Sequence, residues 1–156
     1  SYFDIIPADG GTVTVTDASG KTYVSGDKIK KYTTLTVTAV PSEGYEYLGF
    51  SLNGDEPMTD KTFLMPGIYT MLQPVFSNGA GVDEVAAENV AVYVDAAGNI
   101  VVDGAASAIT VYAVDGRTVV TAKGTGSRTV VASPGAGTYI VRADGVKTII
   151  KTIVVK

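Results

Sequence analysis

The stretch that decides the fold lies at the end of the chain, where three segments rich in β-branched residues follow one another. They read ITVYAVDGR (residues 109–117), PGAGTYIVR (residues 134–142) and KTIVVK (residues 151–156). Apolar and polar residues alternate in the first segment, and a Pro/Gly corner leads into the second. A strand points alternate side chains to opposite faces, so the three segments predict the closing half of a β-sandwich.

The same pattern extends back to residue 90. Seven short runs of strand-forming residues are separated by Gly, Asp-Gly or Pro-Gly turn signals, and they lie at 90–94, 100–102, 108–114, 118–122, 128–131, 138–143 and 147–155. This spacing predicts that residues 90–156 form an immunoglobulin-like, seven-stranded β-sandwich.

The core of this sandwich is expected to come from nine apolar side chains, namely Ile109, Val111, Tyr112, Val119, Val130, Tyr139, Val141, Ile149 and Ile153. A unit of this size buries only about 60% of the surface that its unfolded chain exposes. Removal of the last strand is therefore expected to unfold it.

Residues 1–77 indicate a second small β domain. Val and Thr alternate at residues 12–16 and 34–40, which predicts strands with Val on one face and Thr on the other. Asn53-Gly54 is a strong hairpin signal. We predict a mixed β-sheet module, comparable to a β-grasp, and hence an all-β protein of two small domains.

Two residues of this module interrupt the strand pattern. The segment 45–52 is expected to place Leu48, Phe50 and Leu52 on one face, and Gly49 is expected to form a bulge that re-aims the aromatic side chains. Pro74 has no N–H to donate to a ladder, so its strand is expected to be an edge strand or to contain a bulge.

Residues 78–89 are expected to form a linker, because they are rich in Gly and Ala and contain few β-branched residues. Charge changes sign across it. Residues 1–77 hold nine acids and five bases, residues 78–89 hold three acids, and residues 90–156 hold four acids and seven bases. This balance, with only three Arg in the chain, excludes a nucleic-acid footprint. No apolar run is long enough for membrane insertion.

The residue inventory argues against an enzyme. The chain has no His and no Cys, so it lacks a triad imidazole, a thiol nucleophile and the usual zinc ligands. Paired acids, such as Asp83 with Glu84, fall in turns or in the linker, where solvated carboxylates are ordinary. We expect neither catalysis nor a cofactor.

Two places in residues 1–77 are candidates for ligand binding. Tyr45, Tyr47 and Phe50 are candidates for an aromatic platform for a sugar ring. Such platforms favour Trp, which is absent, and the same three residues suit the hydrophobic side of a twisted sheet, so packing is the favoured interpretation. Asp55 and Glu56 lie in the loop 53–60, where Asn53 and Asp60 add oxygen ligands, but no calcium-loop spacing is present and no metal is expected.

The front module resembles the divergent internalin-type B-repeat of bacterial surface proteins. The resemblance rests on GYEYLGF (residues 44–50), Asn53-Gly54, FLMP (residues 63–66) and Val75-Phe76, and it covers roughly residues 10–77. It implies a small β-rich spacer or ligand-presenting module.

The tail resembles the type A C-terminal sorting domain of type IX secretion at three separated places. These are the strand 109–114 with its Asp115-Gly116 turn, the Pro/Gly corner with its Tyr, and the terminal Lys-bearing strand. The residues concerned are Tyr112, Gly116, Arg117, Pro134, Gly137, Tyr139, Val141, Lys151 and Lys156. The resemblance implies recognition by outer-membrane export machinery and cleavage upstream, which we expect within residues 78–89.

Three hypotheses follow for function. The first is a non-catalytic C-terminal part of a secreted or cell-surface bacterial protein, exported through the periplasm, with a spacer and a sorting signal. The second is an adhesin module that binds a glycan or a host protein through Tyr45, Tyr47 and the loop 53–60. The third is the accessory tail of a longer enzyme.

Overall fold

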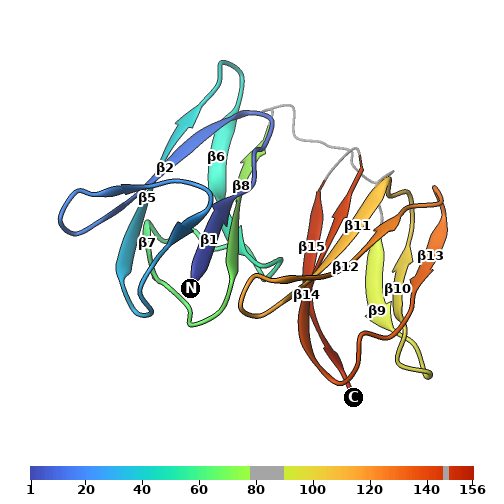
Figure 1. Ribbon diagram of the computed structural model, residues 1–156. Coiled ribbons are helices and arrows are strands. Elements are labelled where there is room, and N and C mark those ends of the chain that lie inside the picture. Colours follow the sequence, from blue (N-terminus) through green and yellow to red (C-terminus); the bar gives the residue numbers. More distant parts are fainter. Residues whose placement is uncertain (78–89, 146–147) are drawn as a thin grey trace. The chain divides into compact units, whose positions relative to one another are not determined.

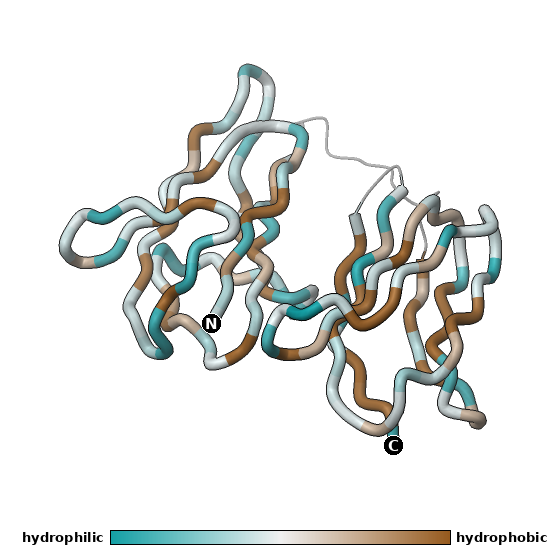
Figure 2. The backbone as a smooth tube through the Cα atoms, viewed as in Figure 1, coloured by the Kyte–Doolittle hydropathy of each residue, from teal (hydrophilic) through white to brown (hydrophobic). Residues whose placement is uncertain are grey.

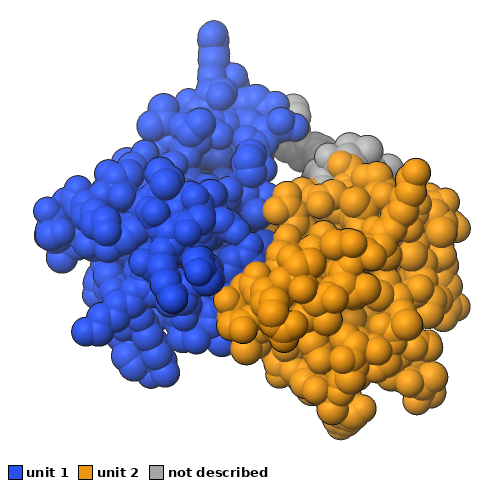
Figure 3. Space-filling view, in the orientation of Figure 1, with its two compact units in different colours: residues 1–83 blue, residues 84–156 orange. Residues whose placement is uncertain are grey.

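The computed structural model describes residues 1–77, 90–145 and 148–156. These residues form fifteen strands and no helix (Figure 1). No helix among them is long and apolar enough to span a membrane. The chain divides into two compact units, residues 1–83 and 84–156 (Figure 3). The predicted linker and cleavage window, residues 78–89, lies outside the described residues. The prediction of an all-β protein with two β domains is confirmed.

The first unit contains two four-stranded sheets. One has the order β4 (Asp27–Lys28), β1 (Tyr2–Ile5), β8 (Thr70–Ser77) and β6 (Glu46–Leu52). The other has the order β3 (Thr22–Tyr23), β2 (Gly11–Asp17), β5 (Thr34–Pro41) and β7 (Thr62–Leu64). All neighbours are antiparallel except β1 and β8, which run parallel with Phe3 opposite Thr70. The first sheet is therefore mixed, and no helix accompanies either sheet among the described residues.

The two sheets of this unit pack face to face through one hydrophobic core. Phe3 and Leu72 enter it from the first sheet, and Val15 and Leu35 enter it from the second. On β2 and β5 the buried residues are Val15, Leu35 and Val37, and Thr12, Thr14, Thr34 and Thr38 are exposed, as the period of two requires. Val40, near the end of β5, is 61% exposed. Figure 2 gives the hydropathy of each residue along these strands. Burial of these apolar side chains is the main force that holds the two layers together.

The predicted bulge is present in β6. Tyr47 pairs with Phe76 and Gly49 pairs with Val75, so Leu48 is the extra residue that has no partner in the register. The extra residue shifts the alternation, and Leu48 is 46% exposed while Phe50 is fully buried. The expectation that Leu48 shares a face with Phe50 is therefore wrong.

Asn53-Gly54 forms the predicted tight turn. Both residues have positive φ, 51° and 81°, and the Asp55 amide donates to the Leu52 carbonyl over 3.0 Å, as in a type I′ turn. The Asn53 side chain is buried, donates to the Tyr69 carbonyl over 2.9 Å and accepts from the Met71 amide over 2.7 Å. Asn53 thus ties this turn to the start of β8.

Pro74 lies where β8 changes from an inner strand to a strand with a single neighbour. β1 pairs with residues 70–72 of β8 and extends no further, while β6 continues alongside Pro74 through Phe50. The missing N–H of Pro74 therefore removes no bond to β1.

The second unit is a sandwich of three and four strands. The smaller sheet has the order β13 (Arg128–Val131), β10 (Ile100–Asp103) and β9 (Ala91–Val94). The larger sheet has the order β12 (Thr118–Lys123), β11 (Ala108–Ala113), β14 (Gly137–Asp144) and β15 (Ile149–Val155). In constant-type immunoglobulin domains the fourth strand joins the sheet of the first, second and fifth strands. Here the fourth strand of the unit, β12, pairs with β11 instead.

The core of the second unit agrees with the expectation for Ile109, Val111, Val141 and Ile153, which are all buried. Val119, Tyr139 and Ile149 pack against it while partly buried, whereas Tyr112 is partly buried and lies outside this cluster. The core also takes residues that we did not predict, among them Val92, Ile100, Val102 and Val155.

The expectation for Val130 is wrong. Val130 is 52% exposed, and Thr129 and Val131 on either side of it are buried. The strand contains two consecutive Val residues, so the alternation alone does not decide which of them faces inward. The register decides it, because Thr129 and Val131 lie opposite Val102 and Ile100 of the core cluster. Val130 lies opposite Val101, which is buried but does not belong to that cluster.

Candidate recognition surfaces

Tyr47 lies near the start of β6 and packs against Phe76, and Tyr45 lies just before the strand. The rings of Tyr47 and Phe76 are 5.6 Å apart and tilted by 55°. Tyr45 covers Gly10, where an added Cβ atom would lie 2.5 Å from the Tyr45 ring, and its own exposure is 38%. Burial raises the pKa of the Tyr47 hydroxyl above its ordinary value. Tyr45 is thus the more accessible ring of the pair.

Asp55 and Glu56 do not join these tyrosines in one site. Both acids are exposed and follow the end of β6, whereas Tyr45 precedes its start. The strand between them has seven residues, which separates the two groups by about 20 Å. Asn53 uses its side-chain oxygen on a backbone amide. Among the described residues, no group of three or more acidic side chains is arranged to hold a metal ion.

The Asp115-Gly116 turn joins β11 to β12. Gly116 has a φ of 93°, and its amide donates to the Ala113 carbonyl over 3.0 Å. The Arg117 amide donates to the Asp115 carboxylate over 2.9 Å, and the Arg117 side chain is exposed. This geometry explains Gly116 as a turn residue and leaves Arg117 available for contact.

Pro134, Gly137 and Tyr139 form a tyrosine corner. The Tyr139 hydroxyl donates to the Pro134 carbonyl over 3.4 Å, and its ring lies 3.4 to 3.5 Å from the position that a Cβ atom of Gly137 would occupy. In immunoglobulin-like folds a Tyr near the start of the sixth strand binds the backbone a few residues upstream in this way. Val141 follows on β14 and is buried. These residues are therefore explained by folding.

Three of the predicted sorting segments meet at one end of the larger sheet. Ala113, which ends β11 before the Gly116 turn, lies opposite Tyr139. Gly137 at the start of β14 lies opposite Val155, and Lys156 is next in the chain. The turn with Arg117, the tyrosine corner and Lys156 thus share one end of the sheet. Lys151 lies further along β15, opposite Val141, and is exposed.

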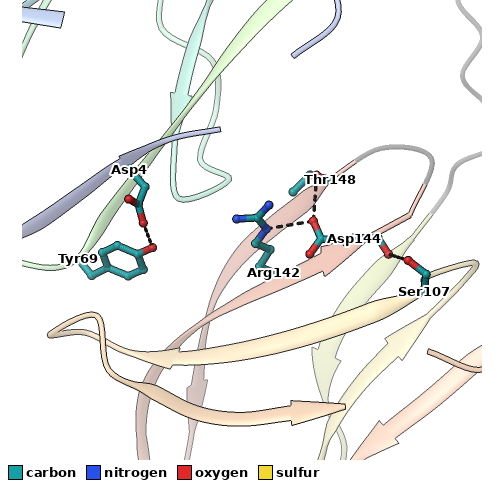
Figure 4. A network of polar contacts seen from close by, with 6 residues as sticks. All are labelled: Asp4, Tyr69, Ser107, Arg142, Asp144 and Thr148. Atoms are coloured by element: carbon teal, nitrogen blue, oxygen red, sulfur yellow. Dashed lines mark hydrogen bonds and ion pairs between the residues drawn. The ribbon is translucent and has the colours of Figure 1, made fainter. Parts of the chain in front are cut away.

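Two polar groupings were not predicted from the sequence. In the first unit, the Tyr69 hydroxyl donates to the Asp4 carboxylate. In the second unit, Asp144 accepts from Arg142 Nε over 3.0 Å and from the Thr148 hydroxyl over 3.1 Å (Figure 4). The Ser107 hydroxyl donates to the Asp144 carbonyl over 3.0 Å. These contacts hold the ends of strands. The sequence alone could not identify the first grouping, because Asp4 and Tyr69 are 65 residues apart. The second grouping consists of residue types that are common on protein surfaces.

Asp17 holds the turn between β2 and β3. Its carboxylate accepts from the Ser19 hydroxyl over 2.6 Å and from the Tyr23 hydroxyl over 2.9 Å, and these bonds lower the pKa of Asp17 from 3.8 to about 2. The bond between Asp17 and Tyr23 is also the largest cause of the raised pKa of Tyr23. The cluster stabilises a turn and carries no reactive group.

The segment 28–32 (Lys-Ile-Lys-Lys-Tyr) was also not predicted to be a functional surface. It holds three of the five bases of residues 1–77, and no acid occurs between Asp27 and Glu43. The signal was present in the sequence as a local excess of Lys in an acidic domain.

Comparison with known families finds a likeness for the first unit. Residues 4–80 match the family model described as the Divergent InlB B-repeat domain. The match does not extend to residues 90–156. No curated protein and no solved structure gave a match to the chain.

Proposed function

From the divergent B-repeat domain at residues 4–80, we propose that the chain serves without catalysis in a secreted or cell-surface bacterial protein. B-repeat domains are typical of bacterial surface proteins. In this proposal the first unit acts as a spacer or interaction domain. The sandwich of residues 90–156 acts as a sorting signal that outer-membrane export machinery of the type IX kind recognises.

The observation that carries the sorting role is the clustering at one end of the larger sheet. The Gly116 turn, the tyrosine corner and Lys156 are separated in sequence, yet the register of β11, β14 and β15 brings them together. Folding accounts for Tyr139 and Val141. It does not account for the exposed basic side chains of Arg117 and Lys156. Arg117 and Lys156 are therefore the residues that we assign to recognition.

The test is a fusion of residues 90–156 to a periplasmic reporter protein in a bacterium that has a type IX system. We expect the reporter to reach the cell surface or the medium. A double variant, Arg117→Ala with Lys156→Ala, is expected to leave the reporter in the periplasm, because the basic contacts are lost while the core is unchanged.

A matched control is Arg128→Ala, which also removes one exposed Arg but lies on the smaller sheet. This variant is expected to be exported normally. Retention of the unmodified fusion in the periplasm, with the sandwich folded as judged by protease resistance, contradicts the proposal. So does equal export of the double variant and the unmodified fusion.

A further inference from the structure

The first unit carries a surface of lysine and tyrosine side chains that the sorting proposal does not use. We define the lysine–tyrosine patch as Tyr2, Lys28, Lys30, Lys31 and Tyr32, all of which are exposed. Tyr2 and Lys28 lie opposite each other on β1 and β4, and the remaining three residues follow β4 after the buried Ile29. The patch is thus continuous through the register and the chain.

Two of the three ammonium groups of the patch lie over its rings. Lys28 Nζ lies 5.3 Å from the centre of the Tyr2 ring, and Lys31 Nζ lies 4.6 Å from the centre of the Tyr32 ring. The stem of Lys31 also passes close to Gly67, where an added Cβ atom would lie 2.9 Å from Lys31 Cδ. Such contacts order long side chains before a ligand arrives, which lowers the entropy cost of binding.

Tyr32 adds an argument from the backbone. It has a φ of 68°, a region that bulky residues rarely adopt, and its side chain is 66% exposed. Two backbone bonds hold this conformation: the Tyr32 amide donates to the Met65 carbonyl, and the Met65 amide donates to the Thr33 carbonyl, each over 2.9 Å. A strained backbone that presents an aromatic ring to solvent contributes nothing to the core, and strain of this kind is concentrated at functional sites.

We propose that the lysine–tyrosine patch binds an acidic polysaccharide, a chain of sugar rings that carry carboxylate or sulfate groups. The apolar faces of sugar rings suit the exposed rings of Tyr2 and Tyr32, and spaced anionic groups suit three separate ammonium groups. The first unit contains no Arg, so the patch offers point charges and no forked donors for a phosphate. The other 72 residues of 1–77 hold nine acids and two bases, which confines attraction for a polyanion to this patch.

The test measures binding of polygalacturonate to the full 156-residue chain by calorimetry, with neutral dextran of matched length as the control ligand. We expect polygalacturonate to bind, the affinity to fall as salt rises, and dextran not to bind. The triple variant Lys28→Ala, Lys30→Ala, Lys31→Ala is expected to bind at least about tenfold more weakly. Lys30→Ala alone is expected to weaken binding more than Lys61→Ala, the matched control elsewhere in the unit.

A second variant separates binding from stability. Tyr32→Gly relieves the positive φ and removes the ring, so we expect a Tm at or above that of the wild type and binding about twofold to fivefold weaker. Tyr45→Ala, which removes an exposed ring of the first unit outside the patch, is expected to leave the affinity unchanged.

Four results overturn the proposal. They are no binding of polygalacturonate, equal binding of dextran, equal losses for Lys30→Ala and Lys61→Ala, and tighter binding of polyglutamate than of polygalacturonate. The last would assign the patch to an acidic peptide.

Discussion

A glycine at position 49 is required for the close approach of the Met58 segment to β6. Gly49 has a φ of 139°, and an added Cβ atom would lie 2.2 Å from the Met58 carbonyl oxygen. The Met58 segment pairs with Phe50 through bonds of 3.0 and 2.6 Å, so it cannot retreat without loss of this bridge. A side chain at position 49 therefore meets both strain and a backbone clash.

Gly49→Ala is expected to lower the free energy of unfolding of the first unit by about 2 kcal/mol or more. Gly20→Ala is the control, because Gly20 has a φ of 87° and nothing within 4 Å of an added Cβ atom. It is expected to cost about 1 kcal/mol from strain alone. Thermal unfolding by calorimetry compares the two, and equal costs would show that the contact with Met58 is unimportant.

Asp17 makes the free energy of unfolding of the first unit depend on pH in the acidic range. Its folded pKa of about 2 lies below the ordinary value of 3.8, so the contribution is present above pH 4 and is lost as pH falls towards 2. Ser19→Ala is expected to raise the pKa of Asp17 the most, and Tyr23→Phe is expected to raise it by less, in the order of the bonds removed. NMR titration of the Asp17 carboxyl carbon measures both, and an unchanged pKa in both variants contradicts this account.

At the scale of elements, the strands were predicted well because β-branched runs and Gly-containing turns are local signals. All seven strands of the second unit fall within two residues of their expected bounds. Features that depend on partners were missed. Leu48 faces solvent because β6 has a bulge opposite β8. Val130 faces solvent because its neighbours Thr129 and Val131 are the residues that lie opposite Val102 and Ile100 of the core cluster. The two-residue strand β4 has no pattern of its own and exists because it pairs with β1.

The candidate sites likewise divide into features set by local sequence, which were predicted, and features set by strand pairing, which were not. The turn-forming residues Gly and Pro identified Gly116 and the Pro134 corner in the sequence. In the structure, hydrogen bonds to residues nearby in the sequence account for both. The sequence could not show that both lie beside Lys156, because this depends on the register of three strands. Nor could it show that β6 separates Tyr45 from Asp55.

Lys151 protects the edge of the larger sheet. It lies on the last strand in the sheet order, opposite the buried Val141, and its side chain is nevertheless exposed. A charge at such a position opposes pairing of the edge with another chain. Lys151→Ile is expected to increase the average particle mass in light scattering relative to the unmodified chain. Lys156→Ile, just past the end of β15, is the control and is expected to have little effect; equal association of both variants would refute edge protection by Lys151.

At the scale of the whole molecule, the two hydrophobic cores share no residue. We therefore expect each unit to fold by itself. β15 supplies Ile153 and Val155 to the second core, and loss of each buried side chain costs about 2 to 4 kcal/mol. A unit of this size has a total stability of only about 3 to 10 kcal/mol.

A chain that ends after residue 148 is expected to lose amide protection throughout residues 90–145 and to keep it in residues 1–77. Hydrogen exchange followed by NMR measures both. A chain that lacks only Lys156 is the control and is expected to keep both sets. Loss of protection in residues 1–77 of the shorter chain would show that the two units depend on each other.

The parallel pairing of β1 with β8 has a mechanical consequence under the proposed role at the cell surface. The chain enters the first unit through one of these strands and leaves through the other, so tension along the chain pulls the two in opposite directions along their common axis. Their backbone bonds are then loaded together in shear and are not opened one after another. If the proposed surface role holds, we expect the first unit to resist tension along the chain through this pair of strands.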